Sequence, residues 1–102
     1  MAKTFQKVKP LVPLAEFLAK ANKVKSFTSS NGRRYKVQRI ENDEMFFFRL
    51  DAKSEEEWSM NLKEVYRAYK DLEDFATVNF KPFVPITHSS ARGLLLHLEM
   101  LE

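Results

Sequence analysis

The chain has 102 residues, carries a net charge of +3 and is 44% hydrophobic. Domains cluster near roughly 100–150 residues, so we expect one domain over residues 1–102. The chain contains no cysteine, which excludes disulfides, thiolate metal ligands and cysteine nucleophiles and favours a reducing, cytoplasmic compartment. No stretch approaches the roughly 18 consecutive apolar residues of a membrane span, so we expect no membrane partner.

Charge is distributed unevenly along the chain. Residues 1–40 hold ten basic side chains and one acidic one, a net of +9, whereas residues 41–102 hold seven basic and thirteen acidic ones, a net of −6. Such asymmetry is typical of a surface that meets nucleic acid or an acidic protein. Two alternatives stay open, because the two parts could neutralise each other in the fold or the charge could simply keep the surface solvated.

The first part of the chain predicts an arm, a helix and a hairpin. Residues 1–9 are basic and aperiodic, which predicts a loose arm. Pro13 suits the first position of a helix, and apolar residues at helical spacing continue from it to Ala21. Asn31-Gly32 predicts a type I′ turn, because both residues tolerate positive φ. By their alternation or apolar character, strands are predicted at residues 26–29, 33–40, 45–50 and 58–60.

The second part of the chain predicts two helices. Asn61 reads as an N-cap completed by Glu64, before a helix over 62–72. Prolines make residues 74–85 an irregular crossing, and a last helix runs from Thr87 to Leu101. The order therefore predicts an α+β domain with an N-terminal helix, a three- to four-stranded antiparallel meander and two C-terminal helices packed on the sheet.

Basic residues gather on and before the predicted hairpin. Arg34, Lys36 and Gln38 share one face of a strand, where a narrow ribbon could contact phosphates, with Gln38 reaching a base edge. The alternative is an edge strand whose positive charges prevent aggregation. The candidate nucleic-acid contacts are Lys23, Lys25, Arg33, Arg34, Lys36, Gln38 and Arg39.

The start of the last predicted helix is a candidate anion site. Free amides, the hydroxyls of Ser89 and Ser90 and the guanidinium of Arg92 lie within about one turn. The alternative is that one of the serines caps the helix. Gly93 costs about 1 kcal/mol relative to Ala inside a helix, which indicates close approach of either another backbone or a ligand.

A third pattern involves acidic residues. Asp43 followed by Asp51-Ala52-Lys53 resembles the acid and acid-x-Lys pattern of the PD-(D/E)xK nucleases. The resemblance implies two carboxylates on a divalent cation and a lysine near the attacked phosphate. The same acids are equally typical of hairpin turns, and our leading expectation is a non-catalytic chain without a metal or another cofactor.

Aromatic residues are abundant, and Phe46-Phe47-Phe48 cannot all face one core. Either Phe47 or Trp58 is expected to be exposed, where a ring could stack a base or form a dimer contact, unless helices cover both faces of the sheet. The leading functional prediction is a small nucleic-acid-binding module that uses the hairpin and the N-terminal arm, on DNA or RNA. The alternatives are a module that binds an acidic protein or itself, and a metal-dependent nuclease.

Overall fold

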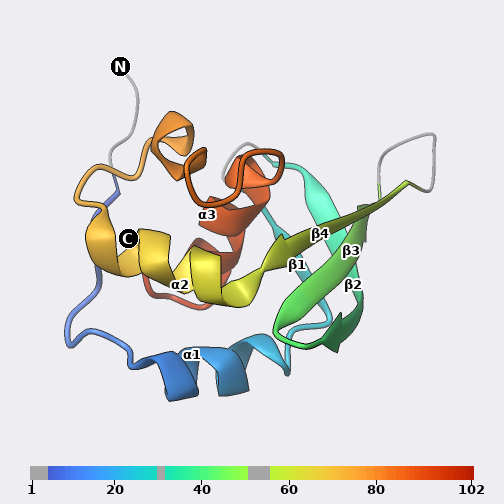
Figure 1. Ribbon diagram of the computed structural model, residues 1–102, viewed down its shortest axis with the longest axis horizontal. Coiled ribbons are helices and arrows are strands. Elements are labelled where there is room, and N and C mark those ends of the chain that lie inside the picture. Colours follow the sequence, from blue (N-terminus) through green and yellow to red (C-terminus); the bar gives the residue numbers. More distant parts are fainter. Residues whose placement is uncertain (1–4, 30–31, 51–55) are drawn as a thin grey trace.

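The computed structural model describes residues 5–29, 32–50 and 56–102, and Figure 1 shows their arrangement. Within these ranges the elements follow the predicted order and confirm the α+β fold. In chain order they are α1 (Leu14–Ala21), β1 (Ser26–Thr28), β2 (Arg34–Glu41), β3 (Glu44–Arg49), β4 (Glu57–Asn61), α2 (Leu62–Asp71), the short 3₁₀ helix η1 (Thr77–Phe80) and α3 (His88–His97).

The four strands form one antiparallel meander in the order β1-β2-β3-β4. β3, the most apolar strand, lies between β2 and β4 and is therefore internal to the sheet. The helices pack on one side of this sheet (Figure 1) rather than on both. Burial agrees, since Tyr35, Phe47 and Met60 are buried on the helix side while Lys36 and Glu57 on the other side are exposed.

Turn residues account for the short connections between strands. Asn42 and Asp43 have φ values of 51° and 62°, the pair of positive φ angles that a type I′ turn needs between β2 and β3. In the β1–β2 connection Gly32 has a φ of 87°, and its amide donates to the carbonyl of Ser29 at 2.9 Å. Asn31, the first residue of the turn predicted there, lies outside the described residues.

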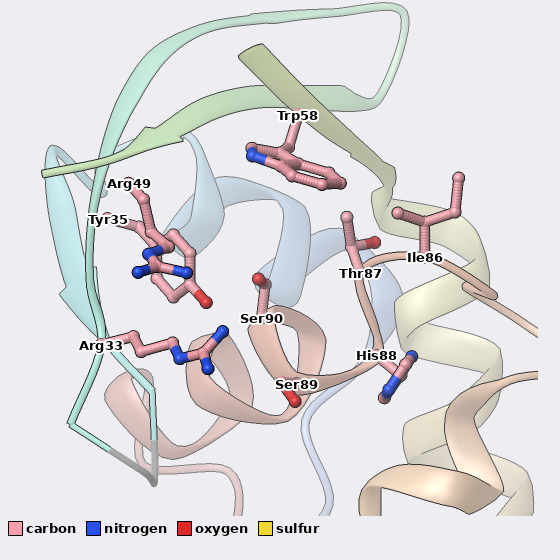
Figure 2. Close-up of a pocket in the computed structure, with 9 residues that line it drawn as sticks. All are labelled: Arg33, Tyr35, Arg49, Trp58, Ile86, Thr87, His88, Ser89 and Ser90. Carbon is pink, nitrogen blue, oxygen red and sulfur yellow. The ribbon is translucent and has the colours of Figure 1, made fainter. Parts of the chain in front are cut away.

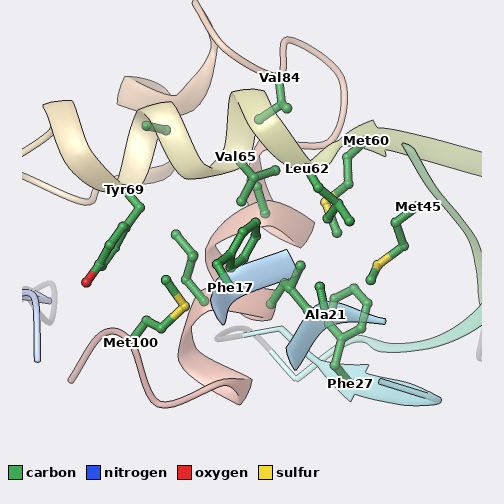
Figure 3. Close-up of a cluster of buried hydrophobic side chains, with 14 of the residues drawn as sticks. Phe17, Ala21, Phe27, Met45, Met60, Leu62, Val65, Tyr69, Val84 and Met100 are labelled. Carbon is green, nitrogen blue, oxygen red and sulfur yellow. The ribbon is translucent and has the colours of Figure 1, made fainter. Parts of the chain in front are cut away.

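The core is one cluster of buried apolar side chains between the helices and the sheet (Figure 3). Five elements each contribute a fully buried side chain to this cluster. These are Phe17 of α1, Phe47 of β3, Tyr69 of α2, Phe80 of η1 and Leu94 of α3. Each large apolar side chain buried in this way contributes about 1.5–3 kcal/mol. The cluster therefore fixes the sheet against the helices and positions the surfaces described below.

Helix starts follow the sequence closely. The side chain of Asn61 accepts a hydrogen bond from the amide of Glu64 at 3.1 Å, which confirms the predicted N-cap of α2. Pro13 is the N-cap of α1, so that helix begins at Leu14, one residue later than expected. No helix among the described residues has the length and apolar character needed to cross a membrane.

The two ends of the chain pair with each other, which the sequence did not predict. α3 ends at His97 instead of continuing to Leu101, because Glu99 has a φ of 61° and turns the backbone away. The following residues then pair with the N-terminal segment, where Lys7 bridges Leu101 and the amide of Val8 donates to the carbonyl of Met100 at 2.9 Å. The described part of the expected arm, residues 5–9, is therefore held against the fold, and residues 1–4 lie outside the described ranges.

Candidate functional site

The basic residues at the start of β2 and just before it point to both faces of the sheet. Successive side chains on a strand alternate in direction, so the consecutive residues Arg33 and Arg34 face opposite sides. Arg33 shares the helix side with the buried Tyr35, and Arg34 shares the other side with Lys36. The basic hairpin is thus divided between two separate surfaces.

We call the side of the sheet that the helices leave uncovered the outer sheet face. The strand register aligns its side chains in rows, with Lys36 opposite Phe48 and Phe48 opposite Glu57. Phe46 and Phe48 are half-buried there, next to exposed polar groups. The described residues of the outer sheet face are Ser26, Thr28, Arg34, Lys36, Arg39, Glu41, Glu44, Phe46, Phe48, Glu57, Ser59 and Asn61.

Arg39 is held by groups of its own protein. Its guanidinium lies 4.1 Å from the ring centroid of Phe46, its Nη1 lies 3.0 Å from Oε2 of Glu57, and its Nε lies 3.4 Å from Oε1 of Glu41. Two carboxylates therefore offset the charge of this predicted phosphate contact. This pair of interactions makes Arg39 a weaker candidate than its neighbours.

Gln38 lies at an irregularity in β2. The register shifts between Val37 and Arg39, so Gln38 has no partner residue on β3. Strict alternation would place Gln38 beside Lys36 on the outer sheet face, but the shift brings Arg39 there, opposite Phe46. Gln38 is exposed, but it is not part of the aligned rows.

The other predicted basic contacts remain available. All five are exposed, and none forms an ion pair with another residue in the described part of the chain. The carbonyl of Lys25 accepts the amide of Val37 at 2.9 Å, which extends the β1–β2 pairing beyond β1 and places this lysine at one end of the ribbon. The five exposed basic residues without an ion pair in the described ranges are Lys23, Lys25, Arg33, Arg34 and Lys36.

The aromatic prediction was wrong for Phe47 and correct only in part for Trp58. Phe47 is fully buried and packs edge-on against Tyr35, with ring centroids 5.4 Å apart. Trp58 is half-buried on the helix side, and the rings on the outer sheet face are Phe46 and Phe48. Side-chain alternation puts Phe46 and Phe48 on the same face of the strand. It would have identified them as the outer rings if the sequence had also shown that helices cover only one face.

A cavity of about 260 Å³ lies between β2–β4 and the first turn of α3 (Figure 2). Arg33 of the basic hairpin lines it together with Ser89 and Ser90 of the predicted anion site. Tyr35, Arg49 and Trp58 line it from the sheet. The fold thus unites two groups of candidate residues that lie more than fifty positions apart in the sequence.

Arg92, the third residue of the predicted anion site, is placed elsewhere. Its Nη1 donates to the carbonyl of Phe75 at 3.2 Å, and its guanidinium lies 5.0 Å from the ring centroid of Phe5. Burial lowers the pKa of this guanidinium. Arg92 does not line the cavity, because its guanidinium is held against Phe75 and Phe5 instead.

Gly93 is explained by packing and not by a ligand. A Cβ atom on Gly93 would lie 2.7 Å from Cα of Ser29, which is closer than two carbon atoms can approach. The alternative left open by the sequence is therefore decided, since α3 needs a glycine where it crosses the end of β1.

The nuclease-like pattern is not assembled among the described residues. Oδ2 of Asp43 lies 3.4 Å from Nζ of Lys63, and the carbonyl of Asp43 accepts the amide of Leu62. Asp51 and Lys53 lie outside the described ranges. Within those ranges, no group of three or more histidine or acidic side chains is placed to hold a metal ion.

Comparisons of the chain with family models, with curated proteins and with solved structures found no match. The outer sheet face and the cavity are the two candidate sites.

Proposed function

We propose that the chain binds single-stranded nucleic acid, DNA or RNA, on the outer sheet face. The observation that carries the proposal is the row formed by Lys36 and Phe48, with Arg34 two residues away on the same side of β2. Both cations are exposed and form no ion pair within the described residues. A cation beside a ring on an open sheet is what a stacked base and its phosphate require.

The distances suit an extended strand of nucleic acid. Arg34 and Lys36 are two residues apart, which is about 7 Å along a β-strand. Bases that stack on aromatic rings gain about 1–3 kcal/mol each, and the phosphates gain affinity by releasing counterions. A base can reach the ring of Phe48 only when it is unstacked, which favours single strands over a duplex.

The acidic residues indicate where the phosphates would lie. Glu41, Glu44 and Glu57 occupy the β2–β3 turn and the β4 side of the outer sheet face. Phosphates are repelled there and attracted toward the β1–β2 ribbon, where Arg34 and Lys36 are exposed. A nucleic-acid strand would therefore run along β1 and β2 with its bases turned toward β3.

Titration with a single-stranded oligonucleotide at about 50 and about 200 mM NaCl tests this proposal. The double variant Arg34→Gln with Lys36→Gln should bind at least about tenfold more weakly at low salt. The slope of log affinity against log salt concentration should also become less negative by about 1.4, because two phosphate contacts are lost. No binding of the unaltered protein at low salt would remove the proposal.

A matched control separates this site from general charge. Lys70→Gln with Lys81→Gln removes the same charge from exposed lysines on α2 and after η1. This variant should keep its affinity within about twofold and its salt slope unchanged. Equal losses in the two double variants would contradict a site on the outer sheet face.

The ring has its own test. Phe48→Leu keeps an apolar side chain but removes the stacking surface, and we expect about tenfold weaker binding with an unchanged salt slope. Sedimentation of the free protein covers the competing outcome. A dimer that Phe48→Leu dissociates, together with no oligonucleotide binding, would assign this face to self-association.

The absence of cysteine supports a cytoplasmic location as part of the same proposal.

A further inference from the structure

The cavity on the helix side has polar groups that converge on one space. Figure 2 shows the guanidinium of Arg33, the hydroxyl of Tyr35 and the hydroxyl of Ser90 directed toward it. Arg49 also lines the cavity, and the indole of Trp58 lies across the space from Arg33 and the two hydroxyls. None of the described residues that line the cavity is acidic, so its electrostatic preference is for an anion.

Two of these groups are buried side chains without a hydrogen-bond partner among the described residues. Tyr35 and Ser90 are each only 5% exposed, yet neither hydroxyl bonds to another residue in the described ranges. In the described ranges, every fully enclosed side-chain nitrogen or oxygen has a hydrogen-bond partner. The hydroxyls of Tyr35 and Ser90 have none there, so they are not fully enclosed and open onto the cavity. Buried polar groups are nearly always hydrogen-bonded, which indicates that a ligand or water completes these two.

The first turn of α3 supplies further donors. This ten-residue helix begins after Thr87, whose side chain makes no capping hydrogen bond. Its first backbone bond runs from the amide of Ala91 to the carbonyl of Thr87, which leaves the amides of residues 88–90 without an acceptor among the described residues. Free amides and the helix dipole both favour negative charge at this wall of the cavity.

The opposite wall is apolar and planar. The half-buried indole of Trp58 forms one side, and Ile86, which is 73% exposed, stands at the mouth. The volume of about 260 Å³ is slightly below the roughly 300–1,000 Å³ of most small-molecule sites. A ligand that fits has an anionic end and a flat ring that stays partly exposed.

We propose that this cavity binds a nucleoside monophosphate group, with its phosphate between Arg33 and the first turn of α3 and its base against Trp58. The group can be a free nucleotide or the 5′-phosphate end of a strand. The site uses Arg33 on the helix side and does not depend on binding at the outer sheet face, which uses Arg34 and Lys36.

Trp58 is the only tryptophan, so its fluorescence reports directly on this cavity. Titration of the protein with adenosine monophosphate should change the emission in a saturable way. Inorganic phosphate and adenosine each carry half of the recognised chemistry, and each should bind at least tenfold more weakly. No saturable change, meaning a Kd weaker than about 1 mM, would overturn the proposal.

Two substitutions and one control assign the effect to residues. Arg33→Gln should weaken binding of adenosine monophosphate at least tenfold, and Ser90→Ala should weaken it about fivefold. Arg34→Gln, one position along the chain but on the other face, should keep the affinity within twofold. Equal losses in Arg33→Gln and Arg34→Gln would contradict a site on the helix side. Oligonucleotide binding is measured separately. A loss seen only when Arg34 and Lys36 are substituted would report on the outer sheet face and not on the cavity.

Further probes distinguish the two sources of the phosphate. Tighter binding of a 5′-phosphorylated oligonucleotide than of the same strand without that phosphate, lost in Arg33→Gln, would support a strand end. Equal affinities for both strands, with adenosine monophosphate still bound, would support a free nucleotide. Inorganic phosphate binding as tightly as adenosine monophosphate would overturn the role given to Trp58.

Discussion

At the scale of single residues, Gly93 shows how tightly α3 is packed on the sheet. Its missing side chain allows the backbone of Ser29 to approach, because a Cβ atom would lie 2.7 Å from Cα of that residue. Ser29 directly follows β1, and Ser90 of the cavity lies one turn before Gly93. This contact therefore sets the spacing between the two walls of the cavity.

Replacing Gly93 by alanine should destabilise the protein. Overpacking costs about 1–3 kcal/mol, and the better helix propensity of alanine returns about 1 kcal/mol, so we expect a net loss of up to about 2 kcal/mol. Urea denaturation measures the change. A gain of about 1 kcal/mol would show that propensity alone acts and that Ser29 moves aside without cost.

At the scale of elements, the N-terminal segment is fastened to α2 by two tyrosines. The hydroxyl of Tyr66 donates to the carbonyl of Val12 at 2.8 Å, and the hydroxyl of Tyr69 accepts the amide of Val12 at 3.0 Å. Nζ of Lys7 also donates to the carbonyl of Lys70 at the end of α2. These contacts explain why a stretch without periodicity is ordered, since its partners lie more than fifty residues away.

Tyr66→Phe should cost about 1 kcal/mol of unfolding free energy near neutral pH, the usual net value of one hydrogen bond. Burial, and to a lesser extent the neighbouring Tyr69, raise the pKa of Tyr66 above its ordinary value of 10.0. The unfolded state therefore loses this proton first, and the contribution of Tyr66 declines as pH rises above 10.

Urea denaturation at several pH values measures how much Tyr66 contributes to the unfolding free energy at each pH. The gap in stability between the unaltered protein and Tyr66→Phe should narrow above pH 10. Tyr69→Phe serves as a companion, because it removes the other bond to Val12 and tests whether docking of the segment accounts for the loss. A gap that stays constant into the alkaline range would contradict the link to Tyr66.

At the scale of the whole molecule, the two oppositely charged parts of the chain neutralise each other only locally. Among the described residues, the ion pairs that join the first forty residues to the rest are those of Arg39 with Glu41 and Glu57. The other pairs, such as Arg67 with Glu64, lie within the acidic part. Most basic side chains of the first part form no ion pair within the described residues.

The stability of the fold should therefore depend little on salt. Exposed ion pairs contribute about 0–1 kcal/mol each, so raising NaCl from about 50 to about 500 mM should change the unfolding free energy by about 1 kcal/mol or less. Denaturation at both concentrations checks this. A loss of several kcal/mol at high salt would mean that the +9 and −6 parts hold the fold together, which would undermine the proposed nucleic-acid surface.

Local sequence determined the order of the elements. Apolar spacing predicted α1, α2 and the start of α3, and alternation with turn residues predicted the meander. The cap at Asn61 was readable because its partner, Glu64, is three residues away. Such features depend on residues within about one turn or one hairpin, so the sequence alone carries them.

Tertiary packing decided the surfaces. It buried Phe47 and left Phe46 and Phe48 on the outer sheet face, and it brought Arg33 and Ser90 to one cavity. These outcomes depend on which side of the sheet the helices occupy and on contacts between distant segments. Periodicity defines two faces of a strand, but only the packing of the whole core chooses which face meets water.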